Sequence, residues 1–228
     1  MRALAVLLAA GQGTRLGKEV PKALVRLRGR TLLEWSAAAL ARCPEVAAIQ
    51  PVMPPGFEPI APSDGALLPA VEGGARRQDS VVRGLAAGLA ARPELEWVLV
   101  HDAARCLVLP ADASEVLRAA RSTGAALPVV PASDTPKWLT ESRDAVERTP
   151  ERARLAFAQT PQAFRVQVLR EALDKAERDG FEGTDCASLV ERLGVEVRVC
   201  AGRADNFKVT HPDDLARAET VLARRGDA

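Results

Sequence analysis

The sequence predicts an α/β fold with three layers: a mainly parallel, Rossmann-like mixed sheet of about seven strands between two layers of helices. Three observations lead to this prediction. Short apolar segments alternate with longer segments of helical period along the chain. Most of the short segments are continuously apolar, as in strands that are covered on both faces. The first of them runs directly into a glycine-rich loop, the usual arrangement at the ligand-binding edge of such a sheet.

The predicted strands are short apolar segments whose length favours a strand over a helix. The first resembles a signal peptide, but its apolar run is short and reaches Gly11 without a polar spacer, so we interpret it as a buried strand. In chain order the strands are expected at residues 3–9, 47–53, 66–71, 97–101, 125–130, 155–158 and 195–200. Helical periodicity predicts helices at residues 32–41, 80–91, 113–121, 166–179, 185–193 and 212–224.

One long polar segment, residues 132–153, interrupts this alternation. A loop of this length in a compact domain is typically functional or disordered. Two short extended stretches around Ser142-Arg143-Asp144 predict a projecting hairpin, and an isolated hairpin is marginally stable in water. A second subunit is the simplest surface for it to lie against. We therefore expect a single domain over residues 1–228, with 132–153 as a protruding arm for dimerisation and substrate binding.

The composition argues against several classes of partner. Lys and Arg total 31 and Asp and Glu total 30, so overall charge gives no reason to expect a nucleic-acid or membrane partner. No apolar run approaches the length of about eighteen residues that is needed to cross a bilayer. The four cysteines form no C-x-x-C pair and no zinc-like spacing. They are predicted to be buried or half-buried thiols in a reducing compartment, which favours a cytoplasmic location.

The segment 7–22, LLAAGQGTRLGKEVPK, has the composition of a phosphate-binding loop. Glycines let backbone N–H groups approach phosphate oxygens, and cations add positive charge. Two common phosphate motifs do not fit: Glu19 stands where a P-loop needs a hydroxyl, and Leu16 stands where a dinucleotide fingerprint needs its third glycine. A glycine-rich turn with solvated cations remains an alternative. The residues concerned are Gly11, Gly13, Gly17, Arg15, Lys18 and Lys22.

The loop also resembles the signature of the nucleotide-sugar pyrophosphorylase-like transferases, in which LAAG-x-G-x-RLG is followed by PK. Further blocks extend the resemblance over essentially the whole chain and are similar to the 2-C-methyl-D-erythritol 4-phosphate cytidylyltransferase family. They are GG-x-x-R at 73–77 with Ser80-Val81, HDAAR at 101–105, DT-x-K at 134–137, TPQ at 160–162, TD-x-AS at 184–188 and GR-x-DN-x-KVT at 202–210.

This resemblance implies an activity. The family transfers the cytidylyl group of CTP to 2-C-methyl-D-erythritol 4-phosphate and releases pyrophosphate, as a step of non-mevalonate isoprenoid synthesis. The substrate phosphate attacks the α-phosphorus in line, so the protein must bring two anions together and neutralise charge rather than supply a nucleophile. The resemblance also implies Mg²⁺ held mainly by the CTP phosphates, with other divalent cations as alternatives, and a homodimer with exchanged arms.

The same resemblance assigns roles to individual residues. Catalysis is expected from three cations, namely Arg15, Lys22 and Lys208. CTP binding is expected from Ala9, Ala10, Gly11, Gly13, Gly73, Gly74, Arg77, Ser80 and Asp102. Binding of methylerythritol phosphate is expected from Asp102, Arg105, Thr135, Arg152, Thr160, Thr184 and Thr210, with Arg152 reaching across from the partner's arm. Asp102 is also expected to help place the Mg²⁺ ion.

Structural explanations exist for several of these residues. Asp102 would equally cap the following segment or pair with Arg105, and Asp79 or Ser80 would cap a helix that starts near residue 80. Capping would also explain Thr184 and the Thr210-His211-Pro212-Asp213 sequence, and most exposed arginines such as Arg152 are simply solvated.

Two positions depart from the family pattern. Ala75 stands where an acid is common, which leaves backbone contacts to the base intact but removes any side-chain contact. Cys106 stands where proline is usual, which should soften the turn.

Other functions remain open at this point. A ribitol-5-phosphate cytidylyltransferase would share the loop and base pocket, so discrimination would depend on Thr135, Arg152, Thr160 and Thr184. A sugar-1-phosphate or molybdopterin transferase would use GTP or another nucleotide. A non-catalytic nucleotide-binding regulator is disfavoured by the joint presence of the three catalytic cations, and an NAD-dependent oxidoreductase by the missing third glycine.

Overall fold

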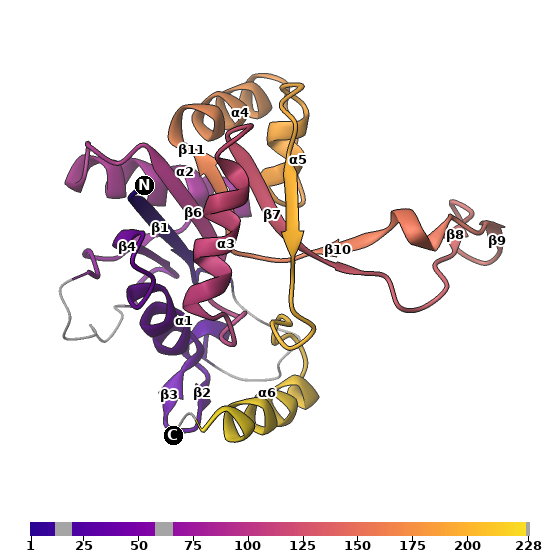
Figure 1. The fold of residues 1–228 in the computed structure, drawn as a ribbon, viewed down its shortest axis with the longest axis horizontal. Coiled ribbons are helices and arrows are strands. Elements are labelled where there is room, and N and C mark those ends of the chain that lie inside the picture. The colour runs from indigo at the N-terminus through magenta and orange to yellow at the C-terminus, as the bar shows by residue number, and fades with distance from the viewer. Residues whose placement is uncertain (12–19, 58–65, 227–228) are drawn as a thin grey trace.

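The computed structural model describes residues 1–11, 20–57 and 66–226, and one central sheet organises them (Figure 1). Within these residues the sheet has eight strands in the order β10-β7-β11-β6-β1-β4-β5, with β12 paired to β7. The strands are β1 Ala3–Leu8, β4 Val46–Met53, β5 Val71–Glu72, β6 Trp97–Asp102, β7 Ala125–Pro131, β10 Ala156–Ala158, β11 Gln162–Arg165 and β12 Arg198–Ala201.

The sheet is mainly parallel, as predicted. Strand β1 pairs in parallel with both β4 and β6, and β12 pairs in parallel with β7, whereas β10 and β11 run antiparallel. In this register Leu8 lies opposite both Val52 and Asp102. The carboxyl ends of β1, β4 and β6 therefore meet at one edge of the sheet, where ligands bind in folds of this class.

Helices cover both faces of the sheet. They are α1 Leu32–Ala41, α2 Arg77–Ala91, α3 Pro110–Ala120, α4 Val166–Arg178, α5 Cys186–Glu191 and α6 Pro212–Arg225, with short 3-10 turns η2 Lys22–Leu24 and η3 Arg152–Arg154. Helices α1 and α3 share one apolar core with the sheet, and α2, α4 and α5 share the other. The three-layer prediction is thus confirmed.

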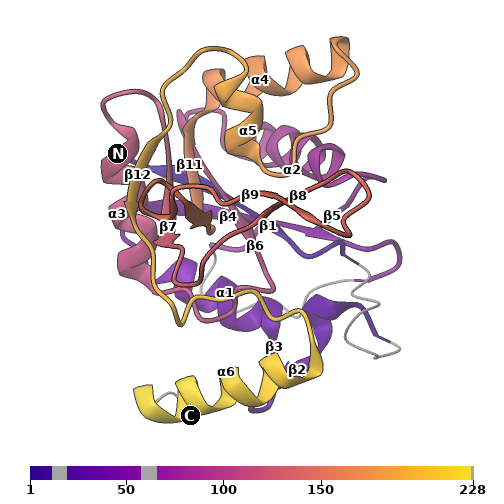
Figure 2. The ribbon, with the colours of Figure 1, turned by 90° about the vertical axis from the view of Figure 1, so that its right-hand side faces the viewer.

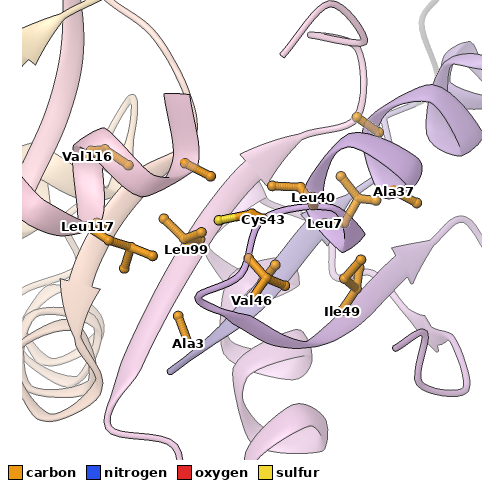
Figure 3. Close-up of a cluster of buried hydrophobic side chains, with 14 of the residues drawn as sticks. Ala3, Leu7, Ala37, Leu40, Cys43, Val46, Ile49, Leu99, Val116 and Leu117 are labelled. Atoms are coloured by element: carbon orange, nitrogen blue, oxygen red, sulfur yellow. The ribbon is translucent and has the colours of Figure 1, made fainter. Parts of the chain in front are cut away.

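Strand β1 shows why its sequence is apolar at every position. Ala3, Ala5 and Leu7 belong to the core beneath α1 and α3, whereas Leu4 and Val6 belong to the opposite core. Figure 3 shows the first of these cores, with Leu7 near Leu40 of α1. Because both faces are buried, alternation between apolar and polar residues is impossible here.

A third apolar cluster holds the C-terminal helix α6. Leu222 of α6 packs in a cluster with Leu27, Trp35 and Val209. Leu27 lies in a small hairpin of β2 Arg26–Leu27 and β3 Arg30–Thr31, and Figures 1 and 2 both show α6 beside it. This packing anchors the chain on both sides of Lys208, which precedes α6.

Some predicted elements differ from the structure. The strand expected at 66–71 is reduced to a single bridge at Leu67 and the two-residue β5, because Pro69 interrupts the segment. Strand β11 and the β2–β3 hairpin were not predicted, since both are short and carry polar residues. Helix α2 begins at Arg77 rather than at residue 80.

The polar segment 132–153 projects away from the sheet (Figure 1). Its hairpin consists of β8 Trp138–Leu139 and β9 Val146–Arg148, which pair antiparallel around the turn that was expected there. Arg143 in this turn has φ 61°. Trp138 is 54% exposed and Val146 is 55% exposed, so the arm presents apolar side chains to its surroundings.

Candidate active site

A cavity of about 310 Å³ opens at the carboxyl ends of β1 and β6. It brings together nine of the residues that the sequence predicted for the site, from five separate parts of the chain. They are Ala9, Ala10, Gly11, Lys22, Gly74, Arg77, Ser80, Asp102 and Lys208. Arg15, Gly13 and Lys18 lie outside the described residues.

Two predicted catalytic lysines meet at this cavity although they are far apart in sequence. Lys22, at the start of η2, is buried and its Nζ donates to Thr210 Oγ1 at 3.4 Å. Lys208 is two residues before Thr210, and its Nζ donates to Asp102 Oδ2 at 2.8 Å. Both amines are thus held at the edge of the sheet where β1 and β6 end.

Asp102, the last residue of β6, lies between two cations. Arg77 Nη2 is 3.1 Å from Asp102 Oδ1, and Lys208 Nζ is 2.8 Å from Oδ2. Burial raises the pKa of Asp102, but the charges of Arg77 and Lys208 outweigh it, so the pKa lies well below its ordinary value. The alternative pairing of this side chain with Arg105 is wrong. Lys22 is a third cationic side chain at the cavity, and Asp102 is the carboxylate among the described residues that line it. This excess of cationic side chains suits an anionic ligand.

The loop before α2 approaches the end of β1 so closely that glycine is required. A Cβ at Gly73 would lie 2.4 Å from Ala10 Cβ, and a Cβ at Gly74 would lie 2.2 Å from Asp79 Cβ. Ser80 Oγ accepts a hydrogen bond from Gly74 N at 3.0 Å and so closes the loop. The backbone of this loop, which lines the cavity, is consequently held in one arrangement.

Helix α2 begins at Arg77 with Arg76 as its N-cap, and Asp79 is its third residue. Its Oδ2 accepts from Arg76 N at 2.9 Å, which satisfies a backbone donor that the helix leaves free. The alternative that Asp79 or Ser80 caps a helix over residues 81–91 is therefore wrong: both lie inside α2, and Asp79 bonds back to the N-cap residue Arg76. Ser80 lines the cavity, and its hydroxyl also donates to Arg76 O at 3.3 Å.

Arg105 is directed to backbone carbonyls rather than into the cavity. Its Nη1 donates to Asn206 O at 2.9 Å and its Nη2 donates to Ala158 O at 3.2 Å. Burial lowers the pKa of its guanidinium. In the described residues Arg105 therefore braces the chain around the site, and its predicted contact with substrate stays a prediction.

Thr160 is also predicted for the substrate and is almost fully buried. Its Oγ1 accepts from Asp102 N at 3.1 Å and lies 2.9 Å from His101 Nδ1. Burial lowers the pKa of His101 to about 4, so the imidazole is neutral at physiological pH. Thr160 is thus tied directly to the strand that ends in Asp102.

The remaining predicted substrate residues are spread around the cavity rather than in it. Thr135 and Arg152 are exposed on the arm, where Arg152 Nη1 donates to Ser133 O at 2.9 Å. Thr184 is exposed before α5. The structure does not bring these three side chains to the cavity within one chain.

The capping alternatives for two threonines are wrong. Asp185 is the N-cap of α5, since its Oδ1 accepts from Ser188 N at 2.9 Å, which leaves Thr184 outside the cap. At α6, Asp214 Oδ2 accepts from both Thr210 N and His211 N at 2.8 Å. The Thr210 hydroxyl instead donates to Lys208 O at 3.0 Å.

Sequence reasoning missed several residues at the site. Arg76 and Ala75 line the cavity beside the two glycines, where their position within the GG-x-x-R block was the available signal. The other missed cavity residues are apolar neighbours of predicted ones, namely Leu8, Ala23 and Ala104.

The donor set around the cavity fits a metal only in company with a ligand. No group of three His, Cys, Asp or Glu residues that would hold a metal ion occurs in the described part of the chain. Asp102 is the acidic side chain among the described residues that line the cavity. A divalent cation here would therefore take most of its oxygen ligands from a bound triphosphate.

The cysteines are free thiols that lie mostly in the interior, as their spacing predicted. Cys43, Cys106 and Cys186 are buried and Cys200 is half-buried, all as free thiols. Burial raises the pKa of Cys106 to about 12 and that of Cys200 to about 11, which leaves these thiols unreactive. Among the described residues, no helix combines the length and the apolar character needed to span a bilayer.

Comparison with known proteins places the chain. The family profile described as "IspD: 2-C-methyl-D-erythritol 4-phosphate cytidylyltransferase" matches residues 3–224. The bifunctional enzyme IspD/IspF of Bradyrhizobium sp. (strain BTAi1) is 44% identical over 227 residues, which are 97% of this chain and 57% of that protein. The enzyme of the same name from Rhodopseudomonas palustris (strain CGA009) is 43% identical over 231 residues, 99% of this chain and 57% of that protein. The chain thus spans little more than half the length of these relatives.

Solved structures give the same answer. The crystal structure of 2-C-methyl-D-erythritol 4-phosphate cytidylyltransferase from Thermus thermophilus is similar with a TM-score of 0.80 and 41% identity, covering 98% of this chain and 100% of that one. The 4-diphosphocytidyl-2C-methyl-D-erythritol synthase from Anaerococcus prevotii has a TM-score of 0.82 and 26% identity, covering 98% of this chain and 99% of that one. This chain belongs to the 2-C-methyl-D-erythritol 4-phosphate cytidylyltransferase family.

Proposed function

We propose that this protein transfers the cytidylyl group of CTP to 2-C-methyl-D-erythritol 4-phosphate, giving 4-diphosphocytidyl-2-C-methyl-D-erythritol and pyrophosphate. Family membership supports the reaction, and the cavity supports its chemistry. The observation that carries the proposal is the meeting of Lys22, Lys208 and Arg77 around one cavity that holds a single described carboxylate. Such a site attracts a triphosphate.

In the proposed reaction a phosphate oxygen of the polyol substrate attacks the α-phosphorus of CTP, and the bond to the β-phosphate oxygen breaks in line. Lys22 and Lys208 neutralise the charge on the equatorial oxygens and hold the two anions together. Arg15, on the glycine-rich loop, would add a third cation. The backbone at Gly73 and Gly74, together with Ser80, would bind the cytosine.

A divalent cation, in our proposal Mg²⁺, would be held by the triphosphate oxygens and by Asp102. When bound, it would neutralise part of the triphosphate charge. Asp102 already accepts from Arg77 and Lys208 through separate oxygens. Its low pKa keeps it ionised at any pH at which the enzyme would work.

The polyol phosphate is proposed to bind between the cavity and the arm of a second subunit. Thr135 and Arg152 lie on the arm, and an Arg fork suits a phosphate because it donates two parallel hydrogen bonds. The exposed Trp138, Leu139 and Val146 of the arm would be covered in this homodimer. We infer a single nucleotidyltransferase domain with this arm as its dimerisation element, acting in the cytoplasm on small molecules rather than on nucleic acid or membranes.

A pyrophosphate-release assay tests this function. The purified chain is given CTP or GTP, Mg²⁺, and either methylerythritol phosphate or ribitol 5-phosphate. Release is expected with CTP and methylerythritol phosphate and should disappear when Mg²⁺ is chelated. Equal or faster release with ribitol 5-phosphate would contradict the proposed substrate, and preference for GTP would contradict the proposed nucleotide.

A further inference from the structure

Three buried polar side chains adjoin the cavity without lining it: His101, Thr160 and Asn206. They are 0%, 4% and 1% exposed, respectively. We refer to them as the buried polar circuit. Each comes from a different part of the fold, since His101 is in β6, Thr160 precedes β11 and Asn206 precedes Lys208.

Hydrogen bonds connect the circuit to both sides of the site. Asn206 Nδ2 donates to Thr160 O at 3.1 Å, and Thr160 Oγ1 accepts from Asp102 N at 3.1 Å. At the cavity, Lys208 Nζ donates to the side chain of Asp102, with Nζ 2.8 Å from Oδ2. The path from Asn206 through Thr160 and Asp102 to Lys208 therefore closes on itself, since Asn206 and Lys208 are two residues apart.

The backbone of Asn206 is fixed as well as its side chain. Arg105 Nη1 donates to Asn206 O at 2.9 Å, and Asn206 N donates to Arg203 O at 3.0 Å. Arg203 in turn is 3.0 Å from Asp112 at the start of α3. The turn that carries Lys208 is thus attached to the sheet through Asn206 and to the helix layer through Arg203.

Not every polar atom of the buried polar circuit has a hydrogen-bond partner. Among the described residues, the buried side-chain atoms without a hydrogen-bond partner are His101 Nε2, Arg105 Nε and Asn206 Oδ1, and all three belong to the circuit or to its direct neighbour. Buried polar atoms without partners reduce stability relative to an apolar core. The hydrogen bonds that the circuit does make fix the geometry around Asp102 and Lys208.

We propose that Asn206 is a positioning residue for the transfer reaction, which sets the place of the Lys208 amine relative to Asp102 by holding the backbone of Thr160. The expected loss of kcat rests on the proposed function, whereas the expected displacement of the Lys208 amine does not. Asn206 does not line the cavity, so it acts through Lys208 rather than by touching a ligand.

The expected effect is on turnover rather than on binding. A lysine displaced by about 1 Å loses much of its contact with the transition state, which costs about tenfold to a hundredfold in rate. Asn206→Asp keeps the size of the side chain, but it replaces the donor to Thr160 O with a negatively charged acceptor. We expect this variant to lose about tenfold or more in kcat, with the KM for CTP nearly unchanged.

A double-mutant cycle with Lys208 separates positioning from general damage. Asn206→Asp is measured in the wild-type background and in Lys208→Ala. If Asn206 acts through Lys208, Asn206→Asp should lower kcat by less than about twofold in the Lys208→Ala background. Equal fold losses in both backgrounds would overturn the proposal.

Gln50 supplies the matched control. It is also a buried amide, 2% exposed, and its Nε2 donates to Pro69 O at 2.7 Å in a region outside the cavity. Gln50→Glu should lose stability comparably, with kcat unchanged. Loss of kcat equal to that of Asn206→Asp would show that any buried amide is needed, and would overturn the specific role of Asn206. Asn206→Ala, which cannot repel the Thr160 carbonyl, should show the same kcat loss.

A second readout does not depend on activity. The chain has five lysines, so reductive ¹³C-methylation gives few signals, and that of Lys208 is identified by its loss in Lys208→Arg. The Lys208 signal should move in Asn206→Asp and stay in place in Gln50→Glu. An unmoved signal in a folded Asn206→Asp variant would overturn the inference. Lack of wild-type pyrophosphate release would instead overturn the proposed function and leave this result to judge the positioning role.

Discussion

The cavity and the arm hold their polar residues in opposite ways. At the cavity, Asp102 has two cationic partners and Lys208 is attached through its neighbours to the sheet. On the arm, Arg152 donates to a carbonyl of the arm itself, and Trp138 is more than half exposed. The difference teaches that, under the proposed function, one chain supplies fixed side chains for the nucleotide, whereas the arm residues proposed for the polyol phosphate need a second subunit to lie against.

The largest expected effect lies in the cavity. Lys208→Ala should lower kcat by about a hundredfold to a thousandfold, since a preorganised charge at the transition state is lost. Lys175→Ala is the matched control, because Lys175 pairs with Asp179 on α4, away from the cavity. Steady-state pyrophosphate release measures both. A loss of kcat below tenfold in Lys208→Ala would contradict the catalytic role proposed for the cavity.

The second effect concerns the buried side chain of His101 and the pH dependence of stability. His101 is neutral when folded because burial lowers its pKa from 6.5 to about 4, whereas the unfolded chain takes up a proton near pH 6.5. The unfolded state therefore binds more protons below pH 6.5, and stability is lost as the pH falls toward 4. The loss from this residue should be about 3 kcal/mol between pH 7 and pH 4.

Urea unfolding at several pH values measures this contribution. In His101→Asn the corresponding part of the pH dependence should vanish. His211→Asn, which changes an exposed histidine, should keep it. The same pH dependence in wild type and His101→Asn would show that the cavity side is less tightly closed than its contacts indicate.

The third effect tests whether the arm completes a neighbour's site. Arg152→Ala should raise the KM for methylerythritol phosphate about tenfold, the value of one charge-assisted hydrogen bond, with the KM for CTP unchanged. Arg154→Ala, in the same exposed turn, is the control.

Mixing subunits makes the test direct. In a dimer of one Arg152→Ala and one Lys208→Ala chain, exchanged arms leave one intact site. At low polyol phosphate, mixed subunits should recover about a quarter of the wild-type rate, since half of the dimers are mixed and each has one intact site. No recovery after subunit exchange would indicate that each arm serves its own chain.

The smallest effect concerns association. Trp138→Ser should raise the dimer dissociation constant about tenfold, because a covered Trp contributes strongly to an interface. Val82→Ser, on the exposed side of α2, should have no effect, although Val82 is 47% exposed. Sedimentation equilibrium distinguishes the two. Equal association in wild type and Trp138→Ser would show that the arm tip stays in solvent.

Much of the fold was predictable because burial leaves a plain signal in sequence. Strand β1 is apolar at every position since both of its faces are covered, and α1 was predicted with its observed bounds. Strand β11 was not predictable in the same way. It has four residues, two of them polar, and it is held by its neighbours β6 and β7 rather than by its own pattern.

The candidate site, too, was only partly predictable from the sequence. The family resemblance implied that Lys22 and Lys208 would meet, because both belong to blocks that match the family's catalytic cations. Spacing alone does not predict that Arg77 and Lys208 take separate oxygens of Asp102, or that Arg105 turns to carbonyls. These choices depend on side-chain packing between segments that are distant in sequence.

The placement of Asp102 between Arg77 and Lys208 has a consequence for the first step of binding. Before any nucleotide arrives, the carboxylate already serves as counter-ion for both side chains, which keeps them close together despite their mutual repulsion. In the proposed function, an incoming phosphate would therefore take the place of the Asp102 carboxylate as the partner of the Lys208 ammonium. In the proposed reaction, nucleotide entry at this edge would thus begin with the replacement of one anionic partner of Lys208 by another.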